Sequence, residues 1–147
     1  MTLPLVVGLG SHHGDDQAGW LVLDRLRERN FPGVRLTRIL HPVDLLDFCD
    51  PQQPLVVCDA CHGSGLPGHV RRCCWPSDQV VATRHSGSHD LSLREVLELG
   101  RQLGRLPQVV EIWTIEGSVW SPGCASSADV ERAAVEVADQ LWGRGHA

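Results

Sequence analysis

The residues best suited to chemistry are carboxylates and histidines that follow apolar runs. Two histidines and two aspartates fall within residues 12–16, shortly after the apolar run 5–9. Another aspartate, Asp59, comes directly after the apolar run 55–58. A carboxylate at the edge of a core is costly to bury unless it is paired or bound to a cation. Asp59 is therefore expected to have a partner.

These residues have the donor types of a transition-metal site. Asp16 and Asp59 offer carboxylate oxygens, and His85 or His89, which flank Ser-Gly-Ser before a predicted helix, offers an imidazole nitrogen. Two oxygens and one nitrogen suit a divalent transition metal and leave coordination positions open. Such an open site predicts that the remaining ligands come from a substrate or a partner.

The elements that must position these residues alternate between strand and helix. Apolar spacing predicts strands at 5–9, 34–40, 55–58, 69–73 and 109–115, and helices at 16–29, 42–48, 91–103 and 128–142. This alternation is typical of a three-layer α/β/α domain around a mostly parallel, approximately five-stranded sheet. Ligands of such sheets collect at the carboxyl ends of the strands, where Asp16, Asp59 and His89 are expected to lie. Ser88 or Asp90 is the expected N-cap of the third helix, and Gly143 and Gly145 are expected to follow the last one.

Composition limits the class of protein. The 147 residues suffice for one domain spanning 1–147, with 42% apolar and 21% charged residues. A net charge of −5 gives no basic surface for nucleic acid or an anionic membrane. The amino-terminal segment has no basic region and no apolar run of membrane-spanning length, which predicts a cytoplasmic protein. The six cysteines are then expected to be reduced.

A dinucleotide site is the first alternative, because residues 8–14 fit a loose G-x-G-x-x-x-G pattern. It is disfavoured because Asp15 and Asp16 occupy the helix start that a pyrophosphate needs, and no acidic residue ends the 34–40 strand to hold a ribose. A purely structural role for the two aspartates is also open. Carboxylates in a first helical turn stabilise the helix by about 0.3–1 kcal/mol without any function.

Cysteine spacing gives two further alternatives. Residues 58–62 match C-x-x-C-H, the attachment string of c-type haem, but haem attachment requires an export signal that the sequence lacks. A zinc site using Cys73 and Cys74 is disfavoured because adjacent strand residues point to opposite faces. Buried free thiols are the expected state of most of these cysteines.

Three motifs in order carry a resemblance to a known family. They are G-L-G-S with G-D-D-Q-A-G (8–11 and 14–19), L-V-V-C-D-A with a later L-P-G (55–60 and 66–68), and H-D-L-S-L (89–93). The segments I-E-G at 115–117 and S-P-G at 121–123, with the helix after them, complete the match. The chain thereby resembles the endopeptidases that mature the large subunit of [NiFe] hydrogenases. Ser11 stands where that family usually has asparagine.

The resemblance implies a function and a site. Its metal-binding and catalytic residues fall on Asp16, Asp59 and His89. It implies that nickel, supplied by the substrate, is the recognition element, and that the protein removes a C-terminal extension from the hydrogenase large-subunit precursor. Hydrolysis at a metal-polarised carbonyl, or by a metal-bound water, is the mechanistic hypothesis. A non-catalytic nickel-binding assembly factor with the same fold is the main alternative.

Overall fold

The computed structural model describes residues 3–30, 33–63, 65–76 and 91–145, and the elements follow the predicted alternation. The strands are β1 (Leu5–Leu9), β2 (Arg35–Ile39), β3 (Leu55–Cys61), β4 (Val70–Trp75) and β5 (Val110–Glu116). The α-helices are α1 (Ala18–Glu28), α2 (Leu93–Gln102) and α3 (Ala128–Gly145). Two 3₁₀ helices, η1 (Gly14–Gln17) and η2 (Pro42–Asp47), follow β1 and β2.

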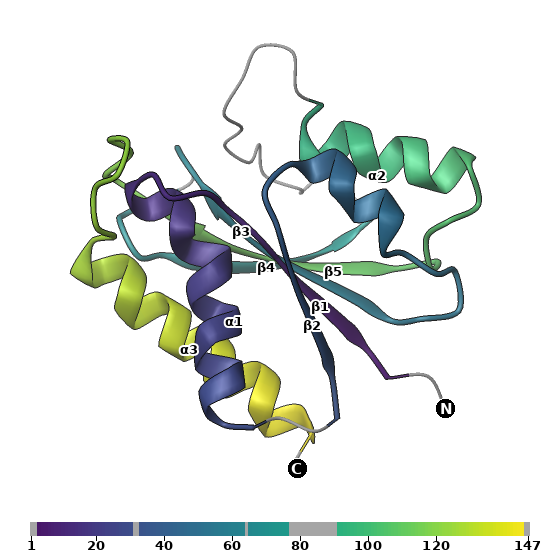
Figure 1. Ribbon diagram of the computed structural model, residues 1–147, viewed down its shortest axis with the longest axis horizontal. Coiled ribbons are helices and arrows are strands. Elements are labelled where there is room, and N and C mark those ends of the chain that lie inside the picture. Colours follow the sequence, from purple (N-terminus) through teal and green to yellow (C-terminus); the bar gives the residue numbers. More distant parts are fainter. Residues whose placement is uncertain (1–2, 31–32, 64, 77–90, 146–147) are drawn as a thin grey trace.

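The five strands form one sheet between two helical layers. The strand order is β2-β1-β3-β5-β4, in which only β4 runs antiparallel to its neighbour. Figure 1 shows α1 and α3 side by side on one face, and α2 with η2 on the other. The fold is therefore a three-layer α/β/α arrangement around a mostly parallel sheet, as predicted.

Alternation along the strands divides the core between the two faces. Val6 and Val56 pack under α1 and α3, whereas Val7 and Val57 pack under α2 and η2. Because every residue of β3 is buried, both faces of this central strand lie in the core. None of the helices within the described ranges is both long and apolar enough to cross a membrane.

Glycines let α1 lie unusually close to the sheet. A Cβ atom on Gly8 would come within 2.5 Å of the Gly19 carbonyl oxygen, and one on Gly10 within 2.7 Å of the Asp16 carbonyl oxygen. A Cβ on Gly19 would lie 2.3 Å from the Cys58 carbonyl oxygen. The glycine pattern thus serves the close packing of η1 and α1 against the sheet.

Several predicted boundaries were wrong; β4, for example, runs to Trp75 and does not end at residue 73. β3 continues through Asp59 to Cys61, because β5 pairs with it along this whole length. The N-cap of α2 is Ser92, whose Oγ accepts from Glu95 N–H while Glu95 Oε1 accepts from Ser92 N–H. The two residues predicted for that cap lie outside the described residues. α3 continues to Gly145 instead of ending before Gly143.

Candidate active site

Asp16 lies in η1, just beyond the carboxyl end of β1. It is only 9% exposed, and Ser11 Oγ donates a 2.6 Å hydrogen bond to Asp16 Oδ2. The backbone closes the same turn, because Ser11 N–H donates to the Asp16 carbonyl and Asp16 N–H donates to the His13 carbonyl. Ser11 therefore fixes the orientation of the Asp16 carboxylate.

Asp59 lies near the carboxyl end of β3, two residues before its last residue, Cys61, and is 1% exposed. Its Oδ1 accepts a 2.7 Å hydrogen bond from the N–H of Ala60. In the parallel register with β5, the Cα partner of Asp59 is Thr114. The carboxylate is thus buried at the carboxyl end of the central strand, where the sequence predicted a group in need of a partner.

The close packing of α1 brings the two aspartates to the same end of the sheet. Gly19 contacts the carbonyl of Cys58, the residue before Asp59, and Asp16 precedes Gly19 by three residues. η1 also packs directly against β3. β1 and β3 are neighbours whose following connections lead to opposite edges of the sheet. This is the position where open α/β sheets form a ligand-binding crevice.

The third predicted residue, His89, lies outside the described residues, as does His85. Across residues 3–30, 33–63, 65–76 and 91–145, no three histidine, cysteine, aspartate or glutamate side chains are grouped closely enough to hold a metal ion. The described part of the site therefore consists of the two carboxylates and the groups that orient them.

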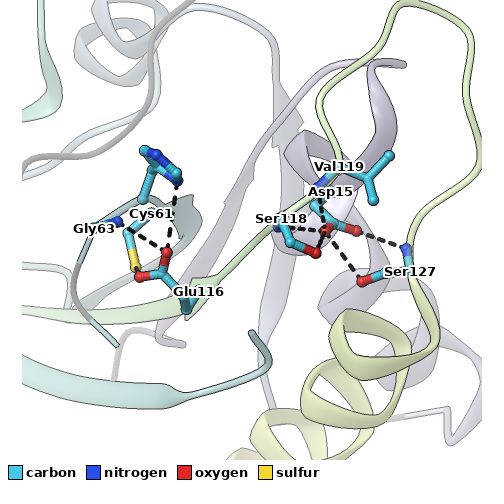
Figure 2. A network of polar contacts seen from close by, with 8 residues as sticks. Asp15, Cys61, Gly63, Glu116, Ser118, Val119 and Ser127 are labelled. Carbon is cyan, nitrogen blue, oxygen red and sulfur yellow. Dashed lines mark hydrogen bonds and ion pairs between the residues drawn. The ribbon is translucent and has the colours of Figure 1, made fainter. Parts of the chain in front are cut away.

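Asp15 has a role that the sequence did not reveal. It is fully buried, and Figure 2 shows its carboxylate surrounded by Ser118, Val119 and Ser127. Asp15 Oδ2 accepts from Ser118 N–H at 2.7 Å and Val119 N–H at 3.0 Å, and Oδ1 accepts from Ser127 N–H at 2.6 Å. Ser127 Oγ donates to Oδ2 as well. The hydrogen bonds that Asp15 accepts therefore connect η1 to the segment that precedes α3.

These hydrogen bonds also control the charge of Asp15. Burial by itself raises the pKa of this carboxyl group, but the backbone N–H groups of Ser118, Ser127 and Val119 outweigh that effect and lower the pKa below its ordinary value of 3.8. Asp15 is consequently ionised at neutral pH. Its partners are 103 to 112 residues away, so no local pattern near Asp15 could have identified them.

Glu116 organises the turn that follows β3. It is 3% exposed at the end of β5, and Figure 2 shows it beside Cys61 and Gly63. Its Oε2 accepts from Gly63 N–H at 2.9 Å, and Cys61 Sγ donates to its Oε1 at 3.7 Å. His62 Nδ1 lies 3.7 Å from Oε2. The position of Glu116 in the I-E-G segment was the only sequence signal for this role.

The histidine pair before Asp16 divides between two environments. His12 is exposed and packs edge-on against Trp20, with 4.9 Å between ring centroids. His13 precedes η1 and is half-buried, and its Nδ1 has no hydrogen-bond partner among the residues that the structure describes. The geometry thus gives His12 a packing contact and His13 a place at the start of the turn that holds Asp16.

The cysteines are free thiols, as expected. Cys58, Cys61 and Cys73 are buried, and Cys49, Cys74 and Cys124 are half-buried. Burial raises the pKa of the Cys58 thiol well above its ordinary range and that of Cys49 to about 11. Because the thiolate is the reactive form, these two cysteines are poor nucleophiles and poor metal ligands at neutral pH.

Comparison with known proteins identifies the fold. No protein-family model matches the chain, and no curated protein is detectably similar to it in sequence. Among solved structures, the [NiFe] hydrogenase maturation protease HycI from Thermococcus kodakarensis matches with a TM-score of 0.71 and 19% identity, over 99% of this chain and 94% of that one. The hydrogenase maturating endopeptidase HybD from E. coli matches with a TM-score of 0.76 and 20% identity, over 96% of this chain and 90% of that one. The chain therefore has, over nearly its whole length, the fold of the hydrogenase maturation proteases.

Proposed function

We propose that the chain is an endopeptidase that removes a C-terminal extension from the large-subunit precursor of a [NiFe] hydrogenase after nickel insertion. The observation that carries the proposal is the placement of Asp16 and Asp59 at the carboxyl ends of adjacent strands, in the fold that maturation proteases share. His89 completes the proposed catalytic and metal-binding set, as the sequence resemblance implies.

In this mechanism the nickel belongs to the substrate. Carboxylate oxygens from Asp16 and Asp59, with the imidazole of His89, are donors that a divalent transition metal accepts. Ser11 and the Ala60 N–H each hold one of the two carboxylates in place, so little orientation has to be imposed when the substrate arrives. The scissile peptide is thereby positioned beside the metal, whose charge polarises the carbonyl for attack by water. Water adds to the carbonyl carbon, the C–N bond breaks, and the leaving amine takes the proton that this water gives up.

Under this proposal, the protease supplies only part of the ligand set of nickel, and this makes the bound ion a signal of finished assembly. Three ligands from the protease leave coordination positions that the substrate must fill. A precursor without nickel lacks the ion that links the two proteins, so it binds weakly and its peptide is not positioned. Recognition and catalysis then depend on the same ion.

The test is cleavage of a [NiFe] hydrogenase large-subunit precursor from the same organism, followed by mass spectrometry. We expect the purified protein to release one C-terminal fragment from nickel-loaded precursor and none from nickel-free precursor. A protein that binds the loaded precursor and leaves it intact is instead a non-catalytic assembly factor. Cleavage that is equal with and without nickel would contradict the proposed recognition.

The hydrogen bond from Ser11 to Asp16 leads to a specific prediction. In Ser11→Ala the buried Asp16 carboxylate loses the donor that orients it, and we expect cleavage to fall about 10- to 100-fold, the usual effect of losing such a partner. Ser121→Ala, the same change at an exposed position, serves as the control and should cleave at the normal rate. A full rate for Ser11→Ala would show that Asp16 does not depend on this contact.

A further inference from the structure

Thr114 has a buried hydroxyl that the fold does not explain. The residue lies in β5 and is 1% exposed, yet its Oγ1 makes no hydrogen bond to any part of the chain that the structure describes. An unsatisfied buried hydroxyl is unfavourable, and such groups in native proteins usually have a reason. Valine has nearly the same shape and is also favoured in strands. Packing alone would therefore favour valine at this position.

The register places this hydroxyl beside the candidate site. Asp59 in β3 is the Cα partner of Thr114 in β5, and register partners project from the same face of a sheet. Two residues earlier, the partners Val57 and Ile112 both pack into the core under α2. Asp59 and Thr114 continue this column toward the carboxyl end of the strands.

The spacing of neighbouring strands brings the Thr114 hydroxyl within reach of the Asp59 carboxylate. Paired strands lie about 4.8 Å apart, so rotation of one side chain is enough to close a hydrogen bond between register partners. A carboxylate has about four acceptor positions on its two oxygens. Asp59 can therefore keep the bond from Ala60 N–H, bind a metal and still accept a hydrogen bond from a hydroxyl.

We propose that Thr114 is a positioning residue for Asp59. When Asp59 engages the nickel-bearing substrate, Thr114 Oγ donates to the Asp59 carboxylate and fixes the direction of the oxygen that contacts the metal. The inference rests on the proposed function and adds a residue to its site. Hydrogen bonds to metal-binding carboxylates are a general means of orienting them, and their loss reduces activity or metal affinity about 10- to 100-fold.

The test compares two substitutions in the full chain. Thr114→Val keeps the shape and removes the hydroxyl, whereas Thr114→Ser keeps the hydroxyl. We expect kcat/KM for nickel-loaded precursor to fall about 10- to 100-fold in Thr114→Val and to stay within about threefold of wild type in Thr114→Ser. Thr37→Val, the same change in β2, should leave cleavage unchanged. The melting temperature of the free Thr114→Val protein should equal or exceed that of wild type, because an unsatisfied buried hydroxyl has been removed.

Each other outcome has a distinct meaning. Wild-type rates in Thr114→Val, or equal losses in both Thr114 variants, would overturn the role of the hydroxyl. A melting temperature several degrees lower in Thr114→Val would show that Thr114 acts through packing, which also overturns the inference. If wild-type protein does not cleave the loaded precursor, the proposed function itself fails and the role of Thr114 in it fails too.

Discussion

Asp59→Asn should reduce cleavage of nickel-loaded precursor by about 100-fold or more. The substitution keeps the size of the side chain but removes the negative charge, which weakens binding to a divalent ion. Asp59 is 1% exposed at the end of β3, so solvent cannot easily take the place of the missing oxygen. Asp16→Asn should have an effect of the same order for the same reason.

Asp50→Asn is the matched control for these variants. Asp50 is exposed in the turn before β3, at the opposite end of that strand, and its Oδ1 accepts from Gln52 N–H. Asparagine can accept the same hydrogen bond, so this variant should cleave as wild type does. Rates should be measured from the released fragment under single-turnover conditions. A substantial rate in Asp59→Asn or Asp16→Asn would remove that residue from the catalytic set.

Asp15→Asn should destabilise the fold by about 2–4 kcal/mol at pH 7. Its buried carboxylate accepts hydrogen bonds from three backbone N–H groups and from the hydroxyls of Ser118 and Ser127, and an amide has only one acceptor oxygen for them. The unfolding free energy can be measured in urea with tryptophan fluorescence. Asp50→Asn should stay within about 0.5 kcal/mol of wild type.

The effect of Asp15 should also depend on pH in a defined direction. The folded-state pKa lies below 3.8, so the stabilisation by Asp15 is complete above the unfolded-state pKa and is lost as the pH falls through the folded-state pKa. The difference between wild type and Asp15→Asn should therefore be largest at pH 6–7 and shrink in acid. A difference that stays constant down to pH 2 would show that the charge of Asp15 does not contribute.

The sequence predicted the fold because local pattern and tertiary structure agree in most elements. The apolar run 5–9 became β1 with the predicted bounds, and the alternation at 34–40 became β2 within one residue of each predicted end. The end of β3 was missed because pairing with β5 extends that strand past an aspartate, which has low intrinsic preference for a strand. The cap of α2 could have been found, since Ser92 and Glu95 form the S-x-x-E pattern of a capping box.

The candidate site was predictable only where residue type and strand position coincide. Asp16 and Asp59 lie at the carboxyl ends of strands, which a sequence pattern can locate. Asp15 and Glu116 depend on partners that the folded chain brings from elsewhere, and their types alone do not distinguish them from ordinary helix-start or strand-end residues. The role of His89 stays a prediction from the sequence.

The hydrogen bonds that Asp15 accepts from Ser118, Val119 and Ser127 also set an order of events during biosynthesis. A ribosome makes the amino-terminal end first, so Asp15 exists long before the residues that donate to it. These contacts span at least 103 residues, and closing such long chain segments is slow compared with forming a single helix. A chain that terminates before residue 118 carries Asp16 and Asp59 but lacks the donors that hold η1 in place. Under the proposed function, the site is therefore complete only after the segment up to Ser127 has been translated.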